Sequence, residues 1–386
     1  KGFKSIHQRP TYPLDSFVLT FFFFELLSMF WMQSAVFGAM WNLFFIFNML
    51  IYYFTTLYIV DKAHLRTLTS VVFFSATIIA ASILLNQWVD ISYSYEPNAS
   101  MLFRWGFSSV VNRYSGYASA QHGSGFIVFT LFLLLASYIN ETRKAMKTLY
   151  FCLAILFLAG LMVSIARGSL LGLLLLLPVY VFLDPHFRGR RLRTLAVCYT
   201  LVFTILVICT PSYIDRILLS LGYSGKMYFT SSSTATATVT VSAGQGVTGW
   251  DARIYRFGKG FTYVWNNPLY MLIGLGAGGF VYIQDYDPEV TNVILAFFFD
   301  LGLVGIFLFF TLICILLQCF RQAYRIRPFT PLHRIFLAVF CGMVADMFVH
   351  GQFDYDWNAL ASKLLFFYLA VFMCTLRILK LETSRA

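Results

Sequence analysis

The stretch from Asp251 to Gly305 reads DARIYRFGKGFTYVWNNPLYMLIGLGAGGFVYIQDYDPEVTNVILAFFFDLGLVG. It begins with a basic segment, continues through a glycine-rich run at 274–279 and an acidic patch at 285–289, and becomes apolar after Asn292. Cationic groups, flexible backbone and carboxylates therefore gather where the chain enters a predicted membrane helix. The simplest interpretation is a polar loop between two spans; the alternative is a functional site at the end of that helix.

The composition of the whole chain indicates a membrane protein. Of 386 residues, 59% are hydrophobic and 19% aromatic, whereas only 12% are charged, about half the usual share of a soluble domain. We therefore predict an all-α polytopic membrane protein, with residues 1–386 forming one membrane domain. The net charge of +11 is explained largely by basic loops, and we expect membrane lipids, not nucleic acid, around the chain.

Ten apolar runs predict about ten transmembrane helices. They lie at about 16–33, 37–60, 68–85, 123–139, 149–163, 170–183, 194–210, 292–317, 335–349 and 360–379. Lys and Arg collect in alternate loops, which places both termini and these loops in the cytoplasm by the positive-inside rule. The segments left outside are 34–37, 86–122, 164–168, 211–291 and 350–359, and 211–291 is the longest. We expect residues to precede Lys1, and no cleavable signal peptide is recognisable.

Arginines lie near membrane boundaries in the outer segments. Arg113, Arg167, Arg253 and Arg256 are predicted to lie on that side. An arginine is costly in lipid, so each should face the bundle interior, a cavity or the lipid headgroups. Arginine binds phosphate through paired, charge-assisted hydrogen bonds, so the functional interpretation is an anionic ligand held by several arginines.

Other ionisable groups are candidates for acid–base chemistry. His350 ends a predicted span, and Asp354 follows four residues later, close enough to orient its ring; a helix cap or interface residue is the alternative. Asp300 and Asp346 lie within predicted spans and are either functional or members of ion pairs inside the bundle. The seven cysteines lack metal-ligand spacing and no nucleotide-binding motif occurs, so we predict no metal and no cofactor.

Six short motifs together resemble the O-antigen ligase and O-antigen polymerase superfamily, from about residue 15 to the C-terminus. They are Arg113-Tyr-Ser-Gly116 with Gln121-His122, Ser164-Ile-Ala-Arg167-Gly168, Asp251-Ala-Arg253, Gly274-Leu-Gly276, Thr291-Asn292 nine residues before Gly302-Leu-Val-Gly305, and His350-Gly-Gln-Phe-Asp354.

The resemblance implies a GT-C-like glycosyltransferase of the bacterial inner membrane with its active face in the periplasm. It implies an undecaprenyl diphosphate-linked oligosaccharide as donor, and either a glycan or the lipid A core as acceptor. The residues that it places in substrate binding are Arg113, Gln121, His122, Arg167, Arg253 and Arg256, and those that it places at the catalytic position are Thr291, Asn292, His350 and Asp354. Arginines suit a metal-independent transfer because they stabilise the charge that develops on a diphosphate leaving group.

One residue departs from the pattern of the family. Its ligases carry His before Asn in the motif that ends Gly-x-x-Gly, and that His is the proposed base, whereas this chain has Thr291. Threonine does not act as a base near neutral pH. The protein is then a polymerase that uses other groups, or His350 or a nearby carboxylate acts as the base, or threonine has replaced a natural histidine. If Thr291 is not catalytic, its simplest role is to cap the following helix.

These observations favour a polymerase of lipid-linked repeat units, with an O-antigen ligase as the near alternative. A transporter of the same lipid-linked glycan is a different class, but it would carry polar groups on both faces and internal repeats, and neither is visible. A non-catalytic component of polysaccharide assembly is the third class, in which the arginines contact only lipid headgroups.

Overall fold

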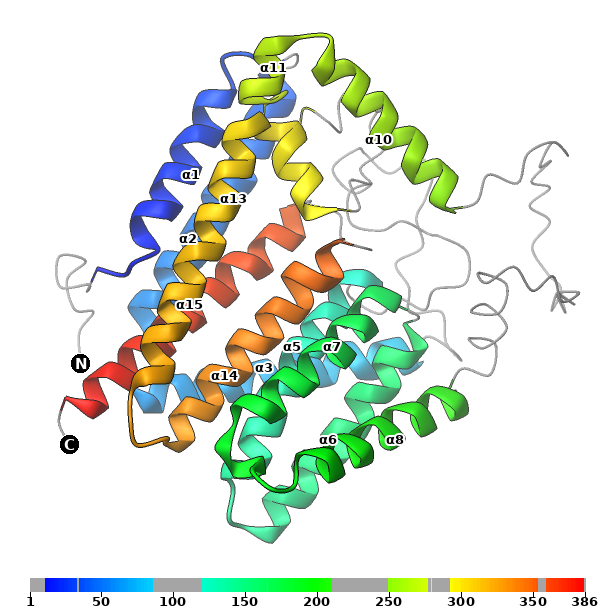
Figure 1. The fold of residues 1–386 in the computed structure, drawn as a ribbon, viewed down its shortest axis with the longest axis vertical. Coiled ribbons are helices and arrows are strands. Elements are labelled where there is room, and N and C mark those ends of the chain that lie inside the picture. Colours follow the sequence, from blue (N-terminus) through cyan, green and yellow to red (C-terminus); the bar gives the residue numbers. More distant parts are fainter. Residues whose placement is uncertain are drawn as a thin grey trace, which may run out of the picture.

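The computed structural model describes residues 11–32, 35–85, 120–164, 166–209, 249–276, 279, 292–352 and 359–384. Within these ranges, side chains are described except at 35–37, 40, 41, 44, 120–122, 167, 206–209, 249–256, 352 and 359–363. The described part of the chain is all-helical, without strands (Figure 1). The predicted fold class is therefore confirmed at the level of an all-α protein.

Each of the ten predicted apolar runs coincides with a helix. The helices of the bundle are α1 (Asp15–Ser28), α2 (Ala35–Tyr58), α3 (Lys62–Leu85), α5 (Ala120–Asn140), α6 (Lys144–Val163), α7 (Arg167–Leu183), α8 (Arg191–Cys209), α13 (Val293–Arg325), α14 (Pro331–Met343) and α15 (Ala359–Thr383). Short elements are the 3₁₀ turns η2 (Pro185–Phe187) and η4 (His350–Gln352) and the π-helical turn η3 (Val344–Val349), which continues α14.

Six helical segments of the described residues are long and apolar enough to cross a membrane. They are Lys62–Leu85, Gly123–Asn140, Lys144–Val163, Val293–Arg325, Pro331–Val349 and Leu364–Thr383. Phe45–Tyr58 and Gly168–Leu183 are shorter apolar helices. The chain therefore has the helices of a multi-pass membrane protein.

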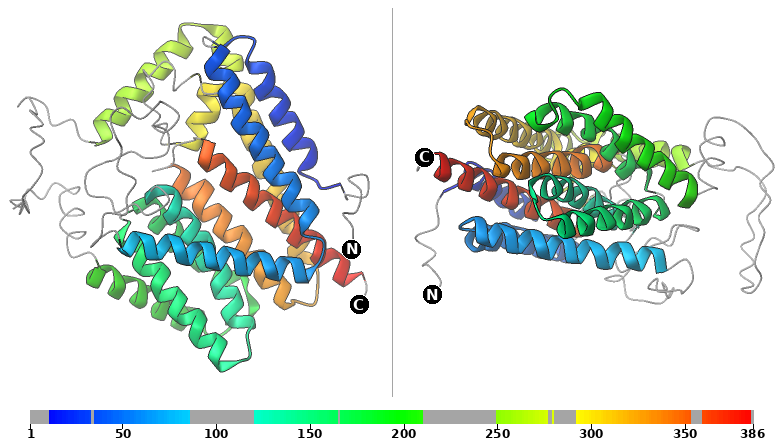
Figure 2. Two further views of the ribbon diagram at one scale, coloured as in Figure 1. Left: turned by 180° about the vertical axis from the view of Figure 1, so that it is seen from behind. Right: turned by 90° about the horizontal axis from the view of Figure 1, so that it is seen from below.

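The bundle brings together helices that are distant in the sequence. α2 packs along α15, α5 along α14, and α3 along α6, while α7 lies against η3. Figures 1 and 2 show the start of α1 and the end of α15 toward the same end of the bundle. α10 (Gly249–Trp265) and α11 (Pro268–Ile273) lie at another edge of the molecule, where the C-terminal part of α10 approaches α13 (Figure 1).

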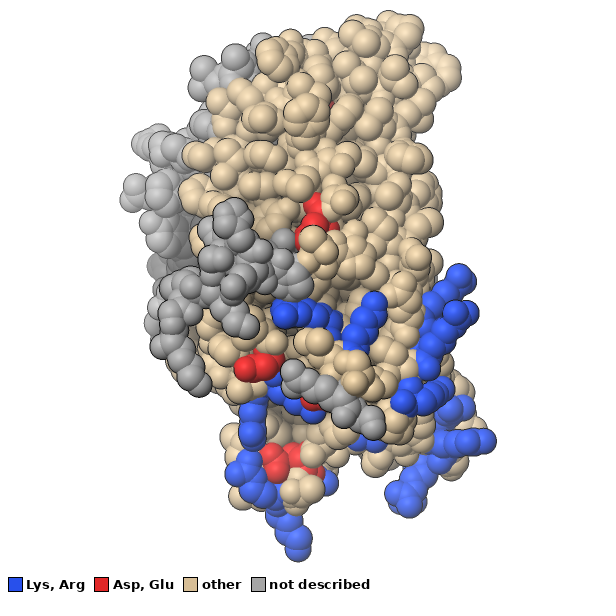
Figure 3. All heavy atoms as spheres, turned by 90° about the vertical axis from the view of Figure 1, so that its left-hand side faces the viewer, with Lys and Arg blue, Asp and Glu red and all other residues tan. Residues whose placement is uncertain are grey.

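The basic loops meet at one end of the molecule. Arg334, at the start of α14, binds the buried Asp184 at the end of α7 (Nε to Oδ2, 3.1 Å) and donates to Asn140 Oδ1 at the end of α5 (2.9 Å). These contacts place the α5–α6, α7–α8 and α13–α14 loops side by side. Exposed Lys and Arg gather over this part of the surface, as Figure 3 shows for one face.

The two glycine motifs form one local structure. Gly302 interrupts α13 with a φ of 63°, and Gly274, with a φ of 75°, ends α11. The interruption leaves carbonyl groups of α13 available, and the N–H groups of Leu275 and Gly276 donate to Phe299 O (2.8 Å) and Asp300 O (2.9 Å). The glycines predicted to give flexible backbone therefore fix the α11 segment against the bend of α13.

A buried acidic residue lies beside this bend. Glu25 of α1 is 1% exposed, and its carboxyl interacts electrostatically with that of Asp300. Gly276, just after α11, packs closely on the end of α1. A Cβ at this position would meet Met32 and the carbonyl of Ser28, three residues beyond Glu25. The structure thus brings α1, α11 and α13 together around two carboxyl groups.

Candidate functional site

Among the predicted motifs, the described residues at the starts of α5, α7 and α13 and at the end of η3 lie at the end of the bundle opposite the basic loops. The N-terminal parts of α5 and α7 meet there through Ser124 and Ser169, whose buried hydroxyl oxygens are 2.8 Å apart. Gly351, after His350, packs closely on Val293, the first residue of α13. The ends of four separate helices are therefore adjacent.

A buried hydrogen-bonded cluster, His350–Asp346–Tyr368, lies where these helices converge. His350 Nδ1 is 3.0 Å from Asp346 Oδ1, and the hydroxyl of Tyr368 donates to Asp346 Oδ2 at 2.9 Å. All three residues are 0% exposed. A carboxylate that accepts two hydrogen bonds is well satisfied in a buried setting. The ring of Tyr368 is itself fixed by stacking on Phe129, with centroids 4.1 Å apart.

Backbone geometry explains why Asp346 points inward. It lies on the π-helical turn η3, and a π turn inserts one extra residue and redirects the side chains that follow. Two glycines make room for this turn. A Cβ at Gly125 would clash with the carboxylate of Asp346, and one at Gly172 would clash with the carbonyl of Ala345. The small residues of α5 and α7 are therefore needed for the position of Asp346.

This geometry defines the chemistry open to His350. When Asp346 is ionised it accepts the Nδ1 proton, and in the neutral ring the proton-accepting nitrogen is then Nε2, which is also buried. A carboxylate–imidazole pair of this type suits general base catalysis. Because the ring is fully buried, a substrate reaches Nε2 only when the groups around it move.

The structure places part of the predicted site near this cluster. Gln121 and His122 are in the first turn of α5, and Arg167 is the first residue of α7; their side chains are outside the described set. Arg253 and Arg256 lie on α10, again without described side chains. The remaining predicted residues, Arg113, Thr291 and Asp354, lie outside the described residues.

The structure corrects the predicted helix cap of α13 and gives His350 a carboxylate partner other than the expected one. The helix cap of α13 is Asn292, not Thr291, since Asn292 Oδ1 accepts the N–H of Leu295 at 2.9 Å. Asn292 thus has a structural role as the N-cap of α13, and its catalytic role stays a prediction. Among the described residues, the carboxylate that contacts the His350 ring is that of Asp346, four residues earlier in the chain. The sequence had suggested Asp354, four residues later, which lies outside the described residues.

Sequence reasoning also missed functional candidates. Tyr368 is 22 residues beyond Asp346 and belongs to another helix, so no local pattern reveals their contact. Glu25 had a readable signal, because it is a carboxylate inside an apolar run. Asp346 was recognised as a carboxylate within a span, and its spacing from His350 suits a contact on one helix face.

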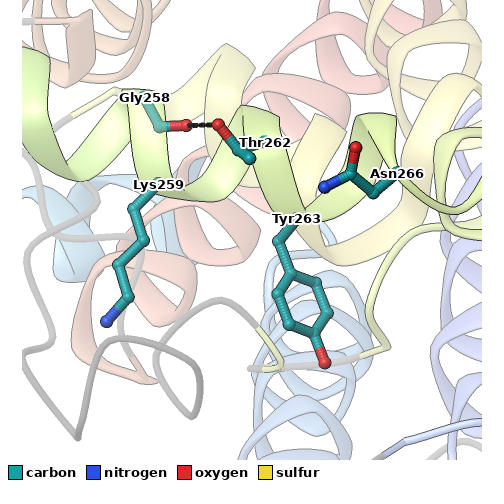
Figure 4. Close-up of a pocket in the computed structure, with 5 residues that line it drawn as sticks. All are labelled: Gly258, Lys259, Thr262, Tyr263 and Asn266. Atoms are coloured by element: carbon teal, nitrogen blue, oxygen red, sulfur yellow. Dashed lines mark hydrogen bonds between the residues drawn. The ribbon is translucent and has the colours of Figure 1, made fainter.

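A groove runs along α10, the helix that packs against the first part of α13. The ring of Phe261 lies against those of Phe298 and Phe299 on α13, with centroids 5.6 and 5.2 Å apart. A cavity of about 510 Å³ opens along the helix. It is lined by Gly258, Lys259, Thr262, Tyr263 and Asn266 (Figure 4).

No metal site of three or more His, Cys, Asp or Glu side chains occurs among the described residues.

The chain matches no protein-family model, and no curated protein matches it in sequence.

Proposed function

We propose that the chain is a glycosyltransferase of the bacterial inner membrane that polymerises lipid-linked repeat units on the periplasmic face. The observation that carries the proposal is the buried Asp346–His350 pair, which lies beneath helix ends that bear Arg167, Gln121 and His122. Buried ionisable groups inside a membrane bundle mark functional sites by default. Arg167, Gln121 and His122 also belong to the motifs through which the sequence resembles the O-antigen ligase and polymerase superfamily.

Orientation follows from the charge distribution. The loops around Arg143, Arg190 and Arg327 carry exposed basic residues at one end of the bundle. By the positive-inside rule this end faces the cytoplasm, and the His350–Asp346–Tyr368 cluster then faces the periplasm. We propose that all ten apolar helices span the membrane in a GT-C-like bundle.

The proposed reaction transfers a glycan from undecaprenyl diphosphate to a sugar hydroxyl. The bond between the anomeric carbon and the diphosphate oxygen breaks, and a glycosidic bond to the acceptor oxygen forms. Arg167, Arg253 and Arg256 stabilise the negative charge on the departing diphosphate, so that no metal is required. His350 Nε2 takes the proton of the acceptor hydroxyl, while Asp346 holds Nδ1–H and stabilises the charged ring.

The proposal is tested by variants assayed with a lipid-linked donor. We expect His350→Ala and Arg167→Ala each to lower turnover by about a hundredfold or more. Lys at position 167 should rescue poorly, because it lacks the planar fork of arginine. Full activity of His350→Ala would show that His350 is structural and that the base lies elsewhere.

The same assay distinguishes the ligase alternative. If Thr291→His alone raises activity sharply in a nearly inactive chain, the natural enzyme carries histidine there and the ligase becomes the better assignment. Surface glycan of a deletion strain gives an independent test. A single-repeat product indicates a lost polymerase, whereas intact long chains left on undecaprenyl diphosphate indicate a lost ligase.

A further inference from the structure

The groove along α10 has the chemistry of a saccharide site. Tyr263 lies parallel to Tyr270, with ring centroids 6.0 Å apart and an interplanar angle of 16°. Such a pair offers a flat aromatic surface, which suits the C–H face of a sugar ring. Asn266 supplies both amide donors and a carbonyl acceptor, which matches neighbouring hydroxyl groups.

The arrangement of these groups favours a glycan over a phosphate. Figure 4 shows Lys259 and Tyr263 pointing to the same side of α10, with Asn266 on the next turn. A site for a bare phosphate concentrates several cations. Among the described lining residues only Lys259 is cationic, and the others are neutral. The cavity volume, about 510 Å³, lies within the range of small-molecule sites.

The groove is open because a glycine leaves its side of α10 uncovered. A Cβ at Gly258 would meet no atom within 4 Å. The opposite side is anchored, since Val264 is 1% exposed and Phe261 contacts α13. A larger side chain at Gly258 would therefore fill the groove without disturbing the packing of α10.

We infer that this groove is a saccharide-binding subsite that holds the glycan chain of the acceptor. Its place on α10 supports the assignment, because Lys259 follows Arg256 by three residues, about 4.5 Å along the helix axis. An acceptor chain bound here lies beside a donor diphosphate bound by the arginines. The assignment to the acceptor rests on the proposed function, whereas saccharide binding by the groove does not.

Direct binding tests the inference without turnover. The probe is the oligosaccharide released by mild acid from the lipid-linked repeat units of the producing strain. Its dissociation constant is measured by titration calorimetry with the full chain in nanodiscs. We expect Gly258→Leu and Tyr263→Ala to raise the constant by about tenfold or more, and Gly258→Ala to have a smaller effect, because a methyl group leaves most of the groove open.

A variant elsewhere on α10 serves as the control. Trp265→Ala removes a side chain that is 74% exposed but does not line the groove. It should bind the probe as the unmodified chain does. Replacing Gly258 in a helix favours folding, so Gly258→Leu should keep its thermal stability.

The outcomes separate the two proposals. Binding that is unchanged in Gly258→Leu and Tyr263→Ala, or undetectable in the unmodified chain, overturns the groove assignment even if turnover is normal. Groove-dependent binding without any turnover of a lipid-linked donor supports the saccharide site and shows that the proposed transferase function is wrong.

Discussion

Tyr368→Phe removes one hydroxyl group from the His350–Asp346–Tyr368 cluster and leaves its packing in place. The lost contact is the 2.9 Å hydrogen bond to Asp346 Oδ2. The phenylalanine ring keeps the stacking on Phe129. A buried hydrogen bond to a charged group contributes about 1.5–3 kcal/mol, because its loss leaves one carboxylate oxygen without that donor. This loss corresponds to a change of about 10- to 150-fold in the unfolding equilibrium constant.

A second tyrosine provides the matched control. The hydroxyl of Tyr199 donates to the backbone carbonyl of Leu174, also at 2.9 Å. Its acceptor is neutral, so Tyr199→Phe should lower the unfolding free energy by only about 0.5–1.5 kcal/mol. Both variants are measured by reversible unfolding in mixed micelles of increasing dodecyl sulfate fraction.

The comparison has a clear refuting outcome. If Tyr368→Phe and Tyr199→Phe destabilise the protein equally, or Tyr368→Phe has no effect, Asp346 does not depend on the tyrosine. A change in turnover with unchanged stability would instead place the hydroxyl in the reaction.

Three further predictions concern other parts of the bundle. Gly125→Ala should lower the unfolding free energy by about 1–3 kcal/mol and reduce turnover, because the added methyl group displaces Asp346; unchanged stability would show that η3 adapts freely. Glu25→Gln should leave the melting temperature unchanged or raise it, since it removes a buried carboxylate beside Asp300; a large destabilisation would indicate a required charge. An impermeant thiol reagent added outside whole cells should modify Arg253→Cys but not Arg190→Cys, and the reverse pattern would overturn the proposed orientation.

The helices could be predicted from the sequence because an apolar run of this length usually forms a membrane-spanning or buried helix. All ten runs coincide with helices, but their ends do not follow from hydropathy. α13 continues to Arg325, well beyond the predicted end at residue 317, because a charged helix end can extend out of an apolar region. The cap at Asn292 was assigned to its neighbour, since Thr and Asn are both good N-caps.

The candidate site could be predicted only in part. His350 and Asp346 were recognised because ionisable groups are rare in apolar segments. Their contact depends on the π turn, and the contact of Tyr368 depends on the packing of α15 against α14, which the sequence does not encode locally. The pairing of Gly274 with the bend at Gly302 is likewise a long-range contact, visible in the sequence only as two glycine motifs.

The central claim is that the chain transfers glycan from a lipid diphosphate. The most direct measurement incubates the purified protein in proteoliposomes with undecaprenyl diphosphate-linked repeat units and follows both chain length and released undecaprenyl diphosphate. The proposal predicts longer lipid-linked chains, with one undecaprenyl diphosphate released per bond formed, and loss of both products in Arg167→Ala. Absence of both products from the unmodified chain, or equal amounts from Arg167→Ala, would contradict it.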